Sequence, residues 1–154
     1  MKIKAYRSDS PVDKDILEIY PDIQVVDSTL LFGVDHVRLA VEKAEQAFET
    51  GCNTSANIFV ESLLWASGQR QIKRALEMYG LNGSKEIVVF GRDIPGDFNG
   101  RLGIREAEIL LGTARINALK SAFSITDLEI EVVPGSVEDA VRELICERIS
   151  LSGV

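Results

Sequence analysis

The stretch from Ser55 to Gly80 constrains the fold more than any other part of the sequence. Its first half is apolar at most positions between Ile58 and Ala66. A helix that is apolar nearly all round is buried in a protein core. Ser55 is a suitable N-cap, because its hydroxyl accepts a hydrogen bond from an amide of the first turn. The sequence therefore predicts a buried helix over Ser55–Ala66.

A polar break follows this helix. Gly68 tolerates the left-handed conformation that ends many helices. Between Gln69 and Tyr79, apolar and charged residues then recur at helical spacing, which predicts a second, amphipathic helix ended by Gly80. The segment Ser67–Gln71, called the hinge below, is predicted to lie at one end of a buried helix, where a rigid support presents its side chains.

The rest of the chain supplies a sheet and further helices. Strands are predicted over Lys2–Arg7, Ile23–Ser28 and Glu86–Arg92, with Leu128–Val133 as a possible edge strand because its apolar residues alternate. Further helices are predicted over Asp13–Tyr20, Asp35–Phe48, Ile104–Leu111, Thr113–Phe123 and Ser136–Ile149, separated by turns and by a loop over Arg92–Gly103. The predicted fold is a single α+β domain over residues 1–154, with a small mixed sheet of three to four strands covered by helices.

Charge and composition exclude several function classes. The net charge of -7 argues against a protein that binds duplex nucleic acid along a basic face. The two cysteines, Cys52 and Cys146, form neither a disulfide framework nor a zinc-binding spacing, which favours a reducing, cytoplasmic location. The pattern of a signal peptide is absent, and no apolar run is long enough to span a membrane.

No catalytic constellation is apparent, so we expect neither an enzyme nor a cofactor or metal site. The single histidine, His36, falls in the first turn of a predicted helix, where the helix dipole disfavours an imidazolium. We interpret it as a surface or capping residue rather than a general base, since a base needs a positioned partner. Trp65 is interpreted as a core residue, although its ring has the chemistry to stack on a base.

A small basic cluster surrounds the hinge of this acidic chain, formed by Arg70, Gln71, Lys73 and Arg74. One interpretation is a solvated helix face. The other is a site for a phosphate-bearing or single-stranded ligand, because arginine and amide groups read the backbone and unstacked bases. Arg70 also has a structural alternative, in which it caps the last carbonyls of the first helix.

Several of these segments together resemble a known family, the small CGI-type subunit of the KEOPS (EKC) complex, also called the PRPK-binding protein family. The resemblance is carried by Ser55–Leu76, Tyr79-Gly80, Glu86–Phe90, Ile23–Asp27 and the helix that opens at Asp35-His36. It covers nearly the whole chain and is most specific over Glu61–Ile72. It is weaker over Arg92–Gly103 and between Gly112 and Pro134.

The resemblance implies a non-catalytic accessory subunit of a tRNA-modifying complex. Such a subunit binds the N-terminal lobe of the complex's atypical kinase subunit, meets the other subunits indirectly, and recruits tRNA by its single-stranded CCA 3′ end for threonylcarbamoyladenosine modification beside the anticodon. It implies no cofactor and no membrane. The residues expected to bind RNA are Asn57, Gln69, Arg70, Gln71 and Arg74, with Arg70 favoured because a guanidinium both pairs with phosphate and stacks on a base.

Two alternatives remain beside this reading. The first is a protein-interaction module that regulates the kinase without touching RNA. The second is a small-molecule enzyme, which would need a polar pocket with strongly perturbed titratable groups.

Overall fold

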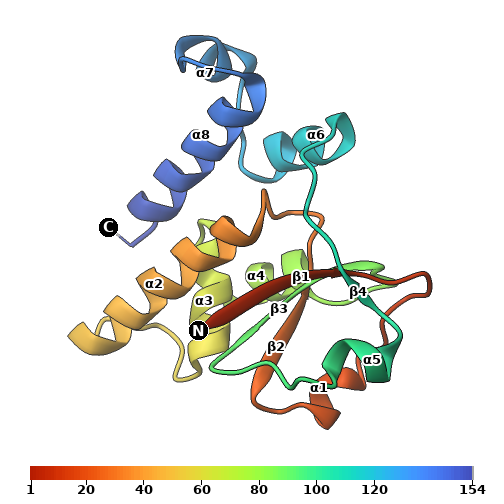
Figure 1. The fold of residues 1–154 in the computed structure, drawn as a ribbon. Helices are drawn as coiled ribbons and strands as arrows, with labels where there is room; N and C mark the ends of the chain where they lie inside the picture. The colour runs from red at the N-terminus through yellow and green to blue at the C-terminus, as the bar shows by residue number, and fades with distance from the viewer. Residues whose placement is uncertain (154) are drawn as a thin grey trace.

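The computed structural model describes residues 1–153 and contains one antiparallel sheet of four strands (Figure 1). The strands are β1 (Lys2–Arg7), β2 (Ile23–Asp27), β3 (Glu86–Gly91) and β4 (Arg105–Glu106), in the order β2-β3-β1-β4. Strand β3 lies between β2 and β1, as its continuous apolar run predicts, and Ile87, Val88, Val89 and Phe90 are all buried. The α+β class is confirmed, but all three strand pairings are antiparallel, where a mixed sheet was predicted.

Helices cover the sheet on both faces. They are α1 (Ile16–Ile19), α2 (Val34–Thr50), α3 (Ile58–Ser67), α4 (Ile72–Tyr79), α5 (Phe98–Leu102), α6 (Thr113–Ala122), α7 (Asp127–Val132) and α8 (Val137–Leu151). The larger hydrophobic core contains Val88 and Phe90 of β3 and the buried side chains of α2, α3, α4, α6 and α8. A smaller core on the opposite face contains Ile87 and Val89 together with α1 and α5. This division follows from the alternation of side chains along a strand.

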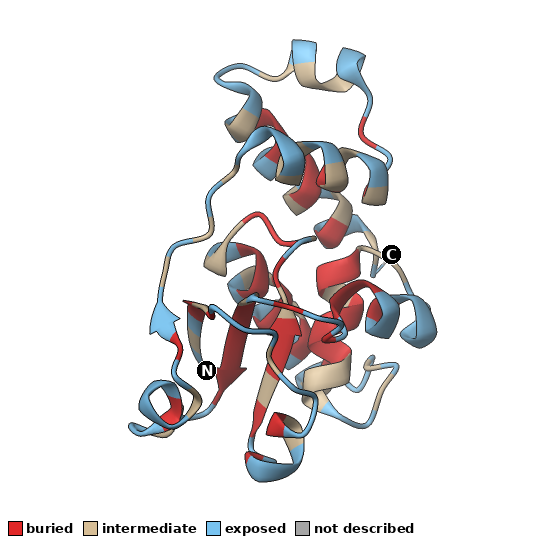
Figure 2. Cartoon of the chain, turned by 90° about the vertical axis from the view of Figure 1, so that its right-hand side faces the viewer, coloured by how far each residue is buried: buried red, intermediate tan, exposed pale blue. Residues whose placement is uncertain are grey.

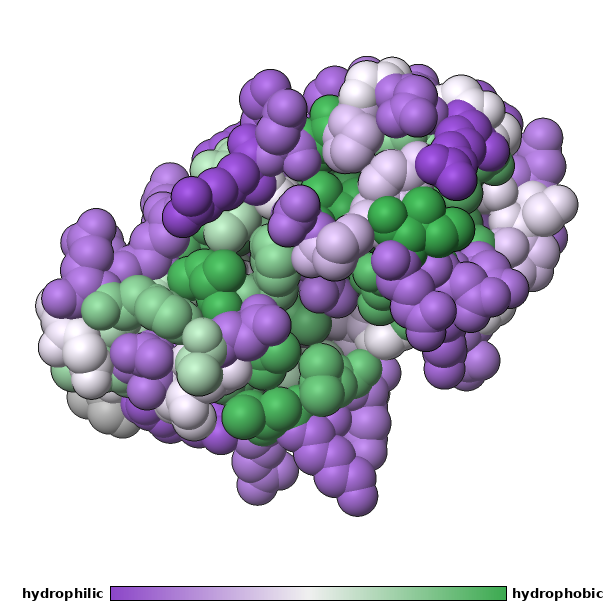
Figure 3. Space-filling view, turned by 90° about the horizontal axis from the view of Figure 1, so that it is seen from below, coloured by the Kyte–Doolittle hydropathy of each residue, from purple (hydrophilic) through white to green (hydrophobic). Residues whose placement is uncertain are grey.

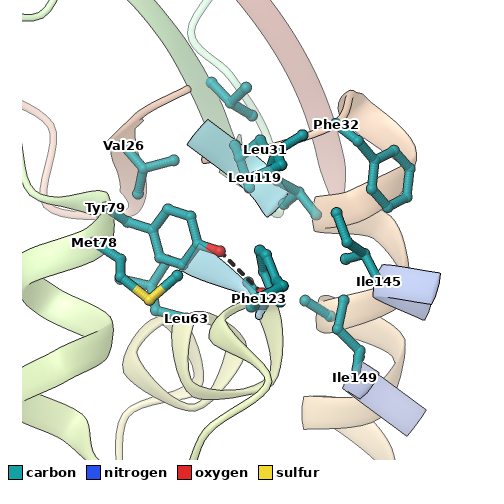
Figure 4. Close-up of a cluster of buried hydrophobic side chains, with 14 of the residues drawn as sticks. Val26, Leu31, Phe32, Leu63, Met78, Tyr79, Leu119, Phe123, Ile145 and Ile149 are labelled. Atoms are coloured by element: carbon teal, nitrogen blue, oxygen red, sulfur yellow. Dashed lines mark hydrogen bonds between the residues drawn. The ribbon is translucent and has the colours of Figure 1, made fainter. Parts of the chain in front are cut away.

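The three C-terminal helices form a layer beyond the sheet. Figure 1 shows an extended segment that leads from β4 to α6, after which α7 and α8 turn back above α2. Ile145 and Ile149 of α8 enter the larger core from one side, opposite Tyr79 and Met78 of α4 (Figure 4). Figure 2 shows that buried residues concentrate in the sheet and on the inward faces of the helices packed around the larger core.

Two predicted elements are wrong. The segment Leu128–Val133 is not an edge strand, because α7 begins at Asp127 behind a capping box between Thr126 and Glu129. The alternation of Leu128, Ile130 and Val132 suggested a strand, yet six residues are too few for periodicity to separate the two structures. The local hydrogen bonds of the capping box favour the helix.

The segment Ile104–Leu111 is also not a helix. Arg105 and Glu106 instead pair with Arg7 and Tyr6 of β1 and supply the fourth strand. The loop predicted over Arg92–Gly103 contains the short helix α5, whose Phe98 is completely buried beneath the sheet's second face.

The remaining elements match, β1 with the predicted bounds and most of the others with shifted ends. Helix α3 starts three residues later than predicted, because Asn57 rather than Ser55 is its N-cap and accepts from the amides of Phe59 and Val60. Helix α4 begins at Ile72 instead of Gln69. The capping box of Ser136 and Asp139 starts α8 as predicted.

Candidate nucleic-acid interface

The hinge Ser67–Gln71 has a defined conformation. Helix α3 ends at Ser67, and Gly68 follows in the left-handed region with a φ of 65°. The Ser67 hydroxyl donates to the carbonyl of Leu64 at 2.7 Å and accepts from the amide of Gln69 at 3.2 Å. Gln71 is the N-cap position of α4. The hydrogen bonds of the Ser67 hydroxyl therefore stabilise the break between the two helices.

A buried histidine fixes the end of α3 just before the hinge. His36 is fully buried, so it is not a surface residue, but its two ring nitrogens bond backbone groups beside the ends of α2 and α3, as a capping residue does. Its Nδ1 accepts from the amide of Phe32 at 3.1 Å, which leaves Nε2 as the donor to the carbonyl of Ala66 at 2.8 Å. Because burial penalises the cation, the pKa of His36 falls to about 4, and the ring is neutral at pH 7.

Tyr79 of α4 bonds the same carbonyl. Its hydroxyl donates to the Ala66 oxygen at 2.9 Å, and burial raises the pKa of Tyr79 far above its usual value. Figure 4 shows the Tyr79 ring in the larger core, pointing toward Phe123. The two side chains tie α2 and α4 to the last turn of α3.

The C-terminal layer backs the hinge. A Cβ placed on Gly68 would lie 3.5 Å from the Phe123 ring and 3.8 Å from Cβ of Arg148. A methyl group at this position would thus be in ordinary van der Waals contact with α8 and with the residue that ends α6. The positive φ of Gly68, rather than a lack of space, is the reason that this position favours glycine.

A small cleft of about 10 Å³ lies beside the hinge, and sequence reasoning singles out only Trp65, Gln69 and Arg70 among the residues that line it. It is lined by Thr54, Glu61, Leu64, Trp65, Gln69, Arg70, Ser152 and Gly153. Glu61 is buried, and its Oε2 accepts from the amides of Thr54 and Ser55 at 2.9 and 2.7 Å. Its Oε1 accepts from the indole of Trp65 at 3.3 Å. The carboxylate therefore ties the loop before α3 to the tryptophan that forms one wall of the cleft.

The C-terminal segment forms the opposite wall. The Arg70 guanidinium donates to the carbonyl of Ser152 at 3.4 Å. Gly153 lies so close to Trp65 that an added Cβ would stand 2.1 Å from the ring. Arg70 thus contacts the end of α8, whereas the structural alternative placed it on the carbonyls of α3. Trp65 is only partly buried and packs against the larger core, so its interpretation as a core residue applies to one part of the ring.

The structure brings four of the five predicted RNA-binding residues to one end of α3. Gln69 and Arg70 line the cleft, and Gln71 and Arg74 are exposed at the start of α4. Asn57 lies at the other end of this helix of 10 residues, and its carboxamide oxygen is used as the N-cap. Among residues 1–153, no ion pair involves Lys73 or Arg74, so their charge is presented to solvent.

A larger concavity of about 690 Å³ opens at the far end of α3, away from the hinge. Its walls are mainly apolar and include Met1, Ile19, Tyr20, Ile58 and Phe59. Figure 3 looks onto this end of the molecule, where apolar residues gather in a hollowed band between hydrophilic ones. Within residues 1–153, no three His, Cys, Asp or Glu side chains cluster so that they could hold a metal ion, and no helix is long and apolar enough to cross a membrane.

Comparison with known proteins adds one positive finding. The model of a family described as kinase binding protein CGI-121 matches residues 9–153, which is nearly the whole chain. A search of curated proteins gave no match.

Proposed function

Because this chain belongs to the CGI-121 family of kinase-binding proteins, we propose that it is the non-catalytic accessory subunit of a cytoplasmic KEOPS complex. In this proposal it binds the atypical kinase subunit and holds the single-stranded CCA end of tRNA at the hinge. The complex then adds threonylcarbamoyl to the adenosine beside the anticodon. A kinase partner follows from the family itself, while tRNA recruitment is the step that needs testing.

The cleft beside the hinge supports the RNA-binding part of the proposal. Arg70 lines it with Trp65, Gln69 and the buried Glu61, so a guanidinium, an aromatic ring and an amide lie together at a depression of only about 10 Å³, which an RNA base would cover rather than enter. These are the groups that bind phosphates and unstacked bases of single-stranded RNA. Lys73 and Arg74 follow within the first turn of α4 and add positive charge on a chain whose net charge is -7. A local basic site of this size suits a single-stranded tip better than a long duplex.

The test compares two arginine variants. Arg70→Ala removes the guanidinium at the cleft, and Arg105→Ala removes an equally charged, exposed side chain from β4 at the sheet edge. Binding of intact tRNA and of tRNA lacking its terminal CCA is measured for both variants and for the wild type. Melting temperatures are recorded for all three proteins.

We expect Arg70→Ala to weaken binding of intact tRNA with an unchanged melting temperature, and removal of CCA to weaken it no further. Arg105→Ala should bind both RNAs as the wild type does. If the wild type binds the kinase but neither RNA, the protein-interaction module without RNA contact is the better description. An Arg70→Ala variant that melts early would assign this residue to stability instead.

A further inference from the structure

Helix α7 is anchored firmly although it contributes no buried residue. Its N-terminus carries the capping box of Thr126 and Glu129. Arg148 of α8 donates to both oxygens of the Glu129 carboxylate, at 2.9 and 3.0 Å. The same arginine donates to the carbonyls of Phe123 and Ser124, at 2.7 and 3.1 Å. These bonds fix the helix on α8, in addition to the packing of Ile130 and Val133 against the larger core.

Two of the exposed side chains of α7 are large and apolar. Leu128 and Val132 are 74% and 79% exposed, and they are separated by four residues, so they lie on one face of the helix. Ile130 and Val133 are only partly buried and face the larger core. Figure 1 places α7 at the outer end of α8, far from the sheet, and no buried residue is coloured in it in Figure 2. Two large aliphatic side chains exposed side by side on one helix face are available as the apolar centre of a contact with a partner.

Acidic residues surround these two side chains. Asp127 and Glu131 are exposed neighbours on α7, and Glu138 and Asp139 begin α8. Asp127 is paired with Lys120 and Asp139 lies within 3.7 Å of Arg142, whereas no ion pair within residues 1–153 involves Glu131 or Glu138. A partner that covers Leu128 and Val132 therefore needs an apolar pocket with lysine or arginine at its rim.

We propose that Leu128 and Val132, called the α7 ridge, dock the kinase subunit. The inference rests on the proposed function, because it takes the kinase as the partner and assigns its place on this chain. The kinase is the expected partner because the matching family is described as kinase-binding. A stable protein–protein interface needs an apolar centre, which the α7 ridge supplies. The hinge is polar and basic, so it suits RNA instead. The acidic rim adds electrostatic attraction for a basic edge of the kinase.

The test uses two charge-introducing variants of the full chain. The first is the double variant Leu128→Asp and Val132→Asp, which places charges on the α7 ridge. The second is Ile19→Asp, which makes the same change at a side chain that is 48% exposed and lines the concavity at the far end of α3. Affinity for the purified kinase subunit is measured by calorimetry for both variants and for the wild type, with circular dichroism as the check of folding.

We expect the double variant to lose about 30-fold or more in kinase affinity, as hot-spot residues do, while its fold and its tRNA binding stay as in the wild type. Ile19→Asp should bind the kinase normally. Kinase binding that survives in the double variant overturns the assignment, and loss in Ile19→Asp alone places the kinase at the concavity. A wild type that does not bind the kinase at all contradicts the proposed function instead of this surface.

The acidic residues around the α7 ridge allow a second test, whose expected result differs from that of an unfolded variant. Glu131→Gln keeps the shape of the side chain and removes one unpaired charge from the rim. We expect slower association with the kinase, an effect that diminishes at high salt, and little change in the dissociation rate. If the association rate does not depend on salt and is equal in the wild type and the variant, the kinase surface that meets the acidic residues is not basic.

Discussion

His36 and Tyr79 donate hydrogen bonds to one and the same carbonyl oxygen, that of Ala66, at 2.8 and 2.9 Å. One donor comes from α2 and the other from α4, and the acceptor lies one residue before the last residue of α3. A carbonyl near the end of a helix lacks an intrahelical partner. Here two buried side chains supply the missing bonds, so the position of the hinge depends on both.

The first prediction concerns pH. The pKa of His36 is about 4 in the folded protein, below its ordinary value of 6.5, so the unfolded chain binds the proton more readily. Stability contributed by the neutral ring is fully present above pH 6.5 and is lost as the pH falls toward 4, by roughly 3 kcal/mol in total. Denaturant unfolding at a series of pH values should show this slope.

The control for this prediction is His36→Gln, which has no titratable group. Its free energy of unfolding should be lower than that of the wild type at pH 7 and nearly flat between pH 6.5 and 5. Carboxylates whose pKa is lowered, such as Glu86 beside Arg115, lose their contribution at lower pH and leave this window to the histidine. An equal slope in both proteins would contradict the prediction.

The second prediction concerns Tyr79. Tyr79→Phe removes the hydroxyl and keeps the ring, and His36 still satisfies the Ala66 carbonyl. We expect a loss of about 1 kcal/mol in the free energy of unfolding. In His36→Gln the same Tyr79→Phe change should cost more, because the shared carbonyl then lacks both original donors. Additive losses in this double-mutant cycle would mean that the two bonds act independently.

The third prediction concerns Glu61. Its carboxylate accepts from two amides and from the Trp65 indole, and Glu61→Gln leaves one carboxamide oxygen to replace both carboxylate oxygens. The side chain is buried, so we expect a loss of about 1–3 kcal/mol. Thermal unfolding measures it. Glu45→Gln makes the same change at an exposed position of α2 and should leave the melting temperature unchanged.

The fourth prediction concerns the C-terminal wall of the cleft. Gly153→Ala places a methyl group where only 2.1 Å separates it from the Trp65 ring, so the segment must move away. Trp65 is the single tryptophan of the chain, and its fluorescence should shift to longer wavelength as the ring becomes more exposed to water. Ser152→Ala keeps the backbone carbonyl that Arg70 contacts and should leave the emission unchanged. Identical spectra of the two variants would show that the contact with Gly153 is loose.

The sequence was sufficient where the physical cause is local. The helices on either side of Gly68 and the capping box at Ser136 depend on neighbours within a few residues. The apolar run after Glu86 indicates burial by itself, although the strands that pair with it lie far along the chain. The burial of His36 also had a local signal, because it stands four residues before Ala40 on the apolar stripe of α2. The polar imidazole of His36 nevertheless favoured a surface position over a buried one.

Other features depend on partners far along the chain. No pattern near Arg70 indicates that its side chain meets Ser152, 82 residues later. The fourth strand forms because Arg105 and Glu106 find β1, which no spacing around them predicts. Glu61 was a partial exception, since its spacing of four residues from Trp65 allowed a contact on the helix, but its bonds to the preceding loop were not foreseeable.

Arg148 connects α7 with the hinge. Its guanidinium bonds Glu129 of α7, and its Cβ lies next to Gly68. A ligand that fixes α7 through Glu129 therefore acts on a side chain that also lies next to the hinge. Any increase in RNA affinity that a bound kinase produces by this route must be matched by an equal increase in kinase affinity when RNA is bound, since a thermodynamic cycle closes in both directions.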